Sequence, residues 1–541
     1  MTQEALSFSP IIMQLGFLIV SLLLAVASGL PSKPPGDAQS CCFKIDDAEQ
    51  YIDPNTGRAM LFHGVNVVYK VFPYYPTNDS FDPQLSLSEE DVDFLVANGF
   101  NVVRLYVAWP GLEPTLGNYN LTYLEIIADM VTRLGERGIF TILDCHQDLF
   151  SPKFCGEGAP DFAVLYPDPP KKPLPFPLPI SLKPFSVDPT TGYPYRNECS
   201  LHSFFVYYFS DATGKAWQSF YNNEQQIQDQ FALFWGVVAK RFTGNPYVLG
   251  YELLNEPWAG DIYSHPSQLE PHVSDPHNLM PLYAKLHTAI RQYDNDHIIF
   301  FEPTVMVTQL PFGGFSSTGL TEGPGGPEYN DRQVFSYHMY CLKQSSSEEP
   351  YQIALCDYLD EDIMGIRMGD LQRLQLAGFM TEWGAYDTTQ PYSNAYEDAL
   401  ELTGLADLHL QPWTYWQYKG YGDITTQSDT GEGLWFNNGT LDVDKLKLLS
   451  RTYAQAVAGR YVSQSFNAAN GDFVLTFEAN VTISSPTVIF LNEQLYYPNG
   501  YSVMIVPSNA ASYTKTPNQL VITFQPQVTS GQIIYVTVKT M

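Results

Sequence analysis

Two glutamates lie in short motifs that could carry acid–base and nucleophilic chemistry. Glu256 lies in an Asn-Glu-Pro motif and Glu382 in a Glu-Trp-Gly motif. Each motif ends an apolar run that is typical of a buried strand. Two carboxylates that face each other from separate strand ends can hydrolyse a β-glycosidic bond with retention when they lie roughly 5–5.5 Å apart, because one attacks the sugar while the other protonates the leaving oxygen.

Polar residues also end most of the other expected strands: Arg104, Asp144 with His146, Asn255, Glu302, His338 with Tyr340, and Trp416. In a barrel of parallel strands, catalytic groups lie at the carboxyl ends of the strands. Each residue alone has a structural explanation, since Arg104 could be a buried ion-pair partner and His146 a core histidine. Their recurrence at one face favours a catalytic site there.

Strand-like and helix-like segments alternate along most of the chain. The patterns predict strands over 61–68, 100–106, 139–144, 248–254, 298–301, 334–338, 379–382 and 413–416. They predict helices over 88–98, 121–137, 222–242, 278–294, 360–376, 392–403 and 442–458, with Ser88 as the first N-cap. About eight β/α units indicate an α/β fold, the (β/α)8 TIM barrel.

Two regions depart from this alternation. An insertion at about 150–220 is rich in proline over 167–184 and in aromatic residues over 204–209, and it could form a lid, a substrate-binding wall or a disordered segment. From about residue 461, short alternating runs between turns predict a C-terminal antiparallel β-sandwich. The expected organisation is a signal peptide at 1–28, a linker at 29–48, a catalytic barrel at 49–459 and the sandwich at 460–541.

The overall charge limits the choice of partner. The chain has 58 acidic and 28 basic residues and a formal net charge of −30, which excludes nucleic acid as a natural partner and disfavours docking on anionic lipid through a basic patch. Aromatic residues make up 14% of the chain. This content suits either a binder of sugars or lipids or an aromatic-rich core.

The N-terminus is typical of a secretory signal, because an apolar run over 11–27 ends in the small-residue pattern Ala25-Val26-Ala27. Glu4 and the lack of Lys or Arg before this run leave an uncleaved signal anchor as the alternative. The sequence predicts a secreted or endolysosomal protein. N-glycosylation triplets agree with that route and begin at Asn78, Asn120, Asn438 and Asn480.

Seven cysteines in an oxidising compartment predict disulfides. We expect Cys155 to pair with Cys199 and Cys341 with Cys356. Cys41 and Cys42 lie near the start of the mature chain, and one of them could pair elsewhere. The odd count leaves at least one thiol unpaired within the chain. No Cys/His spacing is typical of zinc, so we expect neither a metal nor a cofactor.

These motifs resemble glycoside hydrolase family 5, of clan A, over roughly residues 50–460. The resemblance implies Glu256 as acid/base and Glu382 as nucleophile. It further implies that Arg104 and Tyr340 hold the nucleophile, Asn255 holds the sugar 2-hydroxyl, His146 and His338 line the subsite beside the broken bond, and Trp416 stacks under the sugar.

Within that family, segments 63–70, 144–148, 255–260 and 413–418 are most similar to the endoglycoceramidases. Lys70 and the triplet His146-Gln147-Asp148 are the distinctive residues, and the sandwich also resembles theirs. The resemblance implies cleavage between the oligosaccharide and ceramide of a glycosphingolipid, with Lys70 and Asp148 on glycan hydroxyls. Cys145 is a departure, because a larger apolar residue such as Met is expected there.

Other functions remain open from the sequence. The same catalytic pair would serve a glucosylceramidase, a sterylglucosidase or a β-glucanase. A non-catalytic protein that binds glycan or lipid on the same barrel is a further alternative. For the lipid-directed enzyme we expect a monomer that meets its substrate transiently at a membrane or micelle surface. The insertion and the aromatic run over 204–209 could supply an apolar wall for ceramide, or the run could simply belong to the core.

Overall fold

The computed structural model describes residues 41–165, 186–201, 204–305, 316–340, 350–384, 386–389, 395–423, 425 and 431–541. The expected signal segment and the Pro-rich part of the insertion lie outside these residues. Within the described part of the chain, no helix has the length and apolar content needed to span a bilayer.

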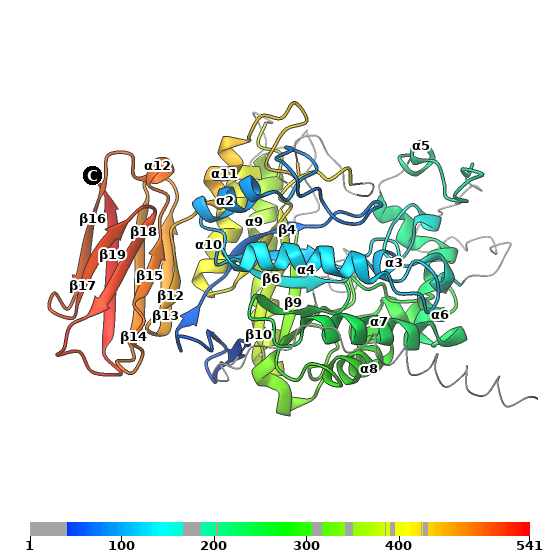
Figure 1. The fold of residues 1–541 in the computed structure, drawn as a ribbon, viewed down its shortest axis with the longest axis horizontal. Coiled ribbons are helices and arrows are strands. Elements are labelled where there is room, and N and C mark those ends of the chain that lie inside the picture. Colours follow the sequence, from blue (N-terminus) through cyan, green and yellow to red (C-terminus); the bar gives the residue numbers. More distant parts are fainter. Residues whose placement is uncertain are drawn as a thin grey trace, which may run out of the picture. The chain divides into compact units, whose positions relative to one another are not determined.

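Eight parallel strands close into a barrel in the order β10-β11-β4-β5-β6-β7-β8-β9, which confirms the predicted fold class (Figure 1). The strands are β4 (His63–Val67), β5 (Val102–Tyr106), β6 (Phe140–Asp144), β7 (Val248–Glu252), β8 (Ile298–Phe301), β9 (Gln333–Met339), β10 (Ala377–Gly384) and β11 (Trp413–Trp416). All of their residues are buried except Phe140, which is half-buried. Burial on both faces explains why these segments appear as continuous apolar runs.

Helices surround these strands (Figure 1). The main ones are α2 (Glu89–Ala97), α3 (Trp109–Leu112), α4 (Leu121–Gly135), α6 (Asp211–Tyr221), α7 (Ile227–Phe242), α8 (Met280–Arg291), α9 (Pro350–Leu374), α10 (Ala395–Leu408) and α11 (Val443–Leu449). Ser88 caps α2 as predicted: its hydroxyl accepts from the Asp91 amide, and the Asp91 carboxylate accepts from the Ser88 amide. This reciprocal capping box fixes where the helix begins.

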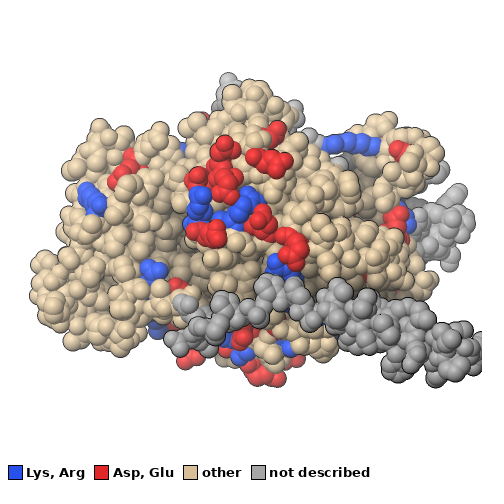
Figure 2. Space-filling view, viewed as in Figure 1, with Lys and Arg blue, Asp and Glu red and all other residues tan. Residues whose placement is uncertain are grey.

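The outer faces of α2 and α4 carry mixed charge. Arg137 pairs with Glu89 and Asp93, and Arg133 pairs with Asp129. Figure 2 shows acidic and basic side chains gathered together over these helices. Such exposed pairs each contribute at most about 1 kcal/mol to stability, so the fold depends on the buried face of each helix instead.

The C-terminal region forms the expected antiparallel sandwich. One sheet has the order β13-β14-β19-β16, and the other has the order β1-β2-β3-β12-β15-β18-β17. The strands are β1 (Lys44–Ile45), β2 (Tyr51–Ile52), β3 (Ala59–Met60), β12 (Tyr453–Val457), β13 (Gly459–Asn467), β14 (Asp472–Ala479), β15 (Thr487–Phe490), β16 (Tyr501–Val506), β17 (Ala511–Thr516), β18 (Gln519–Phe524) and β19 (Ile533–Thr540), with the short helix α12 (Glu493–Tyr496). Strands β3 and β12 to β19 contribute to one apolar core. Ile45 of β1 and Tyr51 of β2 instead pack in a core with barrel residues such as Phe62 and Phe379.

The prediction of a helix over 442–458 is wrong beyond residue 449. α11 ends at Leu449, and 453–457 form β12, which pairs with β15 and β3. The segment Tyr-Ala-Gln-Ala-Val lies almost wholly buried between two neighbouring strands, so it lacks the polar alternation that marks an exposed strand. Strand β1 likewise falls inside the segment that the sequence indicated as a linker.

The described part of the insertion is ordered by short helical turns: Pro152–Phe154, Asp161–Ala163, α5 (Arg196–Cys199) and Phe204–Phe209. Cys155 is joined to Cys199, in agreement with the expected pairing. Tyr208 and Phe209 are at most 3% exposed and pack on Trp258. This end of the aromatic run therefore belongs to the protein core and supplies no open wall for a lipid.

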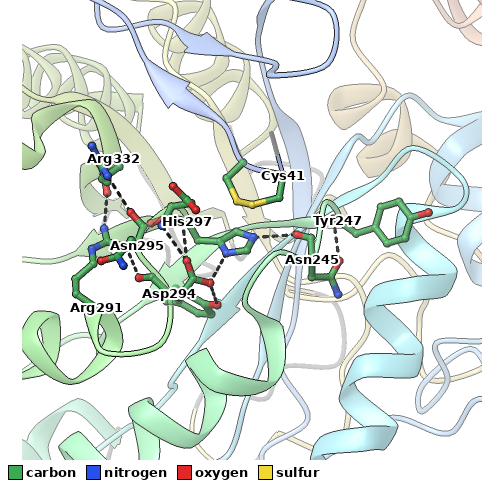
Figure 3. Close-up of a disulfide and its surroundings, with 11 residues drawn as sticks. Cys41, Asn245, Tyr247, Arg291, Asp294, Asn295, His297 and Arg332 are labelled. Carbon is green, nitrogen blue, oxygen red and sulfur yellow. Dashed lines mark hydrogen bonds and ion pairs between the residues drawn. A yellow bond between two sulfur atoms is a disulfide. The ribbon is translucent and has the colours of Figure 1, made fainter. Parts of the chain in front are cut away.

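The first cysteines pair differently from the expectation that one of them could bond elsewhere, because Cys41 and Cys42 are joined to each other. Figure 3 shows this disulfide beside His297, whose imidazole contacts Asp294 and the carbonyl of Asn245. His297 directly precedes β8, so the disulfide lies at the amino-terminal end of the barrel strands. Cys341 lies outside the described residues, so the expected Cys341–Cys356 pair stays a prediction. Cys145 is a buried free thiol.

Gly64 in β4 is a point where only a glycine fits between two strands. A Cβ atom there would lie 1.9 Å from the Val102 carbonyl oxygen in β5. Gly64→Ala should therefore lower the free energy of unfolding by about 3 kcal/mol or more, measured by urea titration. Gly365→Ala is the control, because a Cβ at Gly365 in α9 meets nothing within 4 Å and alanine favours helices. Equal stability of the two variants would contradict the inference that only glycine fits between β4 and β5 at this position.

Candidate active site

The two predicted catalytic glutamates face each other across the carboxyl ends of the barrel strands. Glu256 follows β7 and Glu382 lies in β10. One carboxylate oxygen of each residue and one ring nitrogen of His338 lie within 4.8 Å of one another. This separation is too small for a water molecule to act between the carboxylates on the far side of a sugar, and it fits a retaining mechanism.

Two donors hold the Glu382 carboxylate. Arg104 Nη1 donates to Oε1 at 2.6 Å, and the Tyr340 hydroxyl donates to Oε2 at 2.9 Å. The guanidinium carries a permanent charge, so it favours the ionised form of its neighbour. Burial and the charge of Glu382 together raise the pKa of Tyr340 well above its usual range, so this hydroxyl stays protonated and remains a donor.

Arg104 is itself the centre of a buried cluster. Its side chain is 0% exposed and contacts carboxylates from four other strands or strand ends: Asp144, Glu252, Glu302 and Glu382. It also donates to the side-chain oxygens of Asn66 and Asn255, at 3.0 and 2.8 Å. Burial alone would lower the pKa of Arg104, but the carboxylates outweigh it and raise that pKa well above its usual range.

The backbone at Glu256 is held in an unfavourable conformation. Its φ is +40°, a region that side-chain-bearing residues rarely adopt and that costs about 1–3 kcal/mol. The Glu256 carbonyl accepts from Gln147 Nε2 at 2.9 Å, and its amide donates to Glu302 Oε2 at 3.3 Å. His338 Nδ1 lies 2.7 Å from the Glu256 carboxylate. These contacts direct the carboxylate toward Glu382.

Both predicted histidines lie in the site and are flanked by carboxylates. His146 Nδ1 lies 2.9 Å from Asp144, and its ring stacks on Trp416 with centroids 5.1 Å apart. Burial disfavours the charged form of His146, but Asp144 outweighs it and raises the pKa to about 9. For His338, burial is likewise outweighed by Glu302 and Glu382, which raise its pKa well above the usual range.

Lys70 forms a second buried cluster beside Trp416. Its ammonium lies 2.6 Å from Asp148, 3.1 Å from Glu157 and 3.2 Å from Asp423. It also lies 4.6 Å from the centroid of the Trp416 ring. Burial opposes the charge on Lys70, but the three carboxylates raise its pKa well above the usual range. A group of charged acceptors and donors next to an indole is suited to binding sugar hydroxyls.

All ten residues predicted for the site are described and lie in these two clusters. Sequence reasoning missed Asn66, Glu157, Glu252 and Asp423, and it noted Glu302 without assigning a role. Asn66 and Glu252 lie inside motifs that were identified, so their strand positions were an available signal. Glu157 and Asp423 come from irregular loops, where spacing carries no information.

Three groups of described residues have ligand atoms close enough together to hold a metal ion: Cys41 with Cys42 and His297, Glu256 with His338 and Glu382, and Glu252 with Glu302 and His338. In the first group the two sulfurs are bonded to each other, so they offer no thiolate to a metal. The other two groups depend on His338. The raised pKa of His338 keeps its imidazole protonated, and a protonated ring has no lone pair to offer a metal. The donor set is therefore poorly suited to a metal.

Comparison with known proteins agrees with this geometry. A family model for cellulases of glycosyl hydrolase family 5 matches residues 71–422, and a model for the family 5 C-terminal domain matches residues 451–538. Barrel, carboxylate pair and sandwich together define a glycoside hydrolase. The chain belongs to glycoside hydrolase family 5.

Individual relatives are similar over most of the chain. An endoglycoceramidase from Cyanea nozakii is 36% identical over 521 residues, which cover 96% of this chain and 97% of that protein. An endoglycoceramidase from Hydra vulgaris is 39% identical over 455 residues, covering 84% and 81%. The structure of endo-glycoceramidase II from Rhodococcus sp. in complex with ganglioside GM3 has the same fold, with a TM-score of 0.70, 22% identity, and coverage of 90% of this chain and 98% of that one.

The raised pKa of His146 predicts a pH-dependent stability. Its folded-state pKa of about 9 exceeds the ordinary 6.5, so its contribution is complete below pH 6.5 and is lost as the pH rises through about 9. The difference corresponds to about 3 kcal/mol. In urea titrations across this window, His146→Gln should lose less stability than the wild type. The exposed His265→Gln should follow the wild type, and parallel curves for all three proteins would contradict the prediction.

Proposed function

We propose that this protein is a retaining endo-glycosidase that hydrolyses the β-glycosidic bond between the oligosaccharide and the ceramide of glycosphingolipids. The observation that carries the proposal is the Glu256/Glu382 pair, within 4.8 Å, next to the Lys70 cluster over Trp416. Two relatives that are more than a third identical over most of their length are endoglycoceramidases, which supports the substrate class.

In the first step, a Glu382 oxygen attacks the anomeric carbon, and the bond from that carbon to the ceramide oxygen breaks. Glu256 gives its proton to the departing oxygen, so ceramide leaves as a neutral alcohol. Arg104 and Tyr340 keep Glu382 ionised and direct it. Asn255 has its amide oxygen held by Arg104, and we assign its remaining N–H to the sugar 2-hydroxyl.

In the second step, Glu256 takes a proton from a water molecule whose oxygen attacks the anomeric carbon. The bond from that carbon to Glu382 then breaks, which restores both carboxyl groups and releases the intact oligosaccharide. We propose that His146 and His338 line the subsite beside the broken bond, that Trp416 stacks under the sugar, and that Lys70 and Asp148 bind glycan hydroxyls.

The catalytic pair alone does not select the aglycone. A glucosylceramidase, sterylglucosidase or β-glucanase would use the same chemistry, and the Lys70 cluster favours a substrate with a glycan that extends beyond one sugar. We further propose that the enzyme acts as a monomer at a membrane or micelle surface. Mass spectrometry of the products from gangliosides, glucosylceramide and soluble β-glucan tests the assignment, and activity confined to the last two would overturn it.

Replacement of Glu256 should lower kcat/KM by an amount that depends on the leaving group, whereas replacement of Glu382 should not. Glu382→Gln should lower kcat/KM at least about 10⁴-fold on every substrate, because no nucleophile remains. Glu256→Gln should lose about 10²–10⁴-fold on fluorescent lactosylceramide but little on dinitrophenyl β-lactoside, whose phenol leaves without protonation.

Asp294→Asn is the control for these variants. It alters a buried carboxylate near the amino-terminal end of the barrel strands, and it should change both substrates alike. Wild-type turnover in Glu382→Gln, or equal losses of Glu256→Gln on the two substrates, would refute the assignment of roles.

We also propose that the chain is exported, that it is cut near Ala27, and that the Cys155–Cys199 pair is oxidised on that route. Secretion of the full chain from eukaryotic cells should yield a protein that begins after the apolar run, and treatment with an N-glycosidase should lower its mass. A cell-bound protein with an intact N-terminus would instead identify a signal anchor, and no mass change would show that the triplets are unmodified.

A further inference from the structure

Glu302, at the end of β8, contacts two parts of the acid/base apparatus at once. Its Oε1 lies 3.3 Å from His338 Nε2, and its Oε2 accepts from the Glu256 main-chain amide at 3.3 Å. Its main-chain carbonyl is fixed by the Tyr283 hydroxyl at 2.8 Å. The side chain is 4% exposed, so water does not weaken these contacts.

His338 connects Glu302 to the reacting carboxylates. Its Nδ1 lies 2.7 Å from Glu256 Oε1 and 3.5 Å from Glu382 Oε2, while its Nε2 faces Glu302. With carboxylate oxygens on both sides, the ring serves best as an imidazolium, which contacts Glu256 through Nδ1 at hydrogen-bond distance and forms an ion pair with Glu302 through Nε2. Arg104, at 3.6 Å, and Glu252 also face Glu302. Burial raises the pKa of Glu302 to about 8, although His338 and Arg104 oppose that rise.

We propose that Glu302 is a positioning residue for the acid/base Glu256. It clamps the Glu256 amide in its φ +40° conformation and holds the imidazolium of His338 with one N–H aimed at the Glu256 carboxyl. This inference rests on the proposed function, in which Glu256 protonates the leaving oxygen. In this role Glu302 acts through Glu256 and His338.

The two contacts of Glu302 need two acceptor oxygens, and a glutamine supplies only one. In Glu302→Gln, either the Glu256 amide or His338 Nε2 loses its carboxylate partner. The Glu256 carboxyl is then free to turn from the glycosidic oxygen, while Arg104 and Tyr340 still hold the nucleophile. Proton donation should therefore fail selectively.

The test compares kcat/KM on fluorescent lactosylceramide and on dinitrophenyl β-lactoside, since this constant covers the steps up to formation of the glycosyl-enzyme. Glu302→Gln should lower it about 10–100-fold on the glycolipid and less than about twofold on the activated glycoside. Asp294→Asn should affect both substrates equally. Glu302→Asp keeps a carboxyl group with a shorter reach and should show a smaller difference between the two substrates. It provides a second variant if Glu302→Gln folds poorly.

A double variant separates action through Glu256 from other effects. If Glu302 works through Glu256, Glu256→Gln/Glu302→Gln should be no slower on the glycolipid than Glu256→Gln alone. Equal losses of Glu302→Gln on both substrates, or additive losses in the double variant, would overturn the inference. Failure of Glu256→Gln itself to discriminate between the substrates would instead refute the proposed acid/base, so the two failures are distinguishable.

Discussion

The active site depends on one buried guanidinium. Arg104 projects from β5 and contacts carboxylates contributed by β6, β7, β10 and the end of β8. Four acidic groups in a dry barrel repel one another, and burial of each uncompensated charge costs several kcal/mol. The cation makes this gathering of carboxylates possible, and its planar fork fixes the direction in which the Glu382 carboxylate points. A single side chain, Arg104, therefore connects the ends of five barrel strands and holds the carboxylates of the site together.

Trp416 divides the site into two parts. The ring stacks with His146, which belongs to the catalytic cluster, and it also lies under the ammonium of Lys70, which belongs to the second cluster. In each part a buried cation balances several carboxylates. One indole therefore contacts both buried clusters.

Much of this arrangement was predictable from the sequence. The barrel strands are buried on both faces and appear as apolar runs, and the segment 298–301 was located to the residue. Arg104, Glu256 and Glu382 were found because each is a polar residue at the end of such a run. The segment 453–457 was misassigned because alanine-rich apolar residues fit a helix as well as a buried strand. Glu157 and Asp423 could not be found, because only the folded loops bring them to Lys70.

Two strand pairings between distant parts of the chain have a consequence for the order in which it folds. The barrel closes when β11 pairs with β4. The larger sandwich sheet is completed when β12 pairs with β3. Both pairings join residues near 60 to residues beyond 410, so neither can form until most of the chain has left the ribosome. Contacts of such long sequence separation fold slowly and leave apolar strands exposed meanwhile. Until β11 and β12 are made, β4 and β3 each lack one of their neighbouring strands. Deletion of either partner of these two pairs would leave the other one with an unpaired edge.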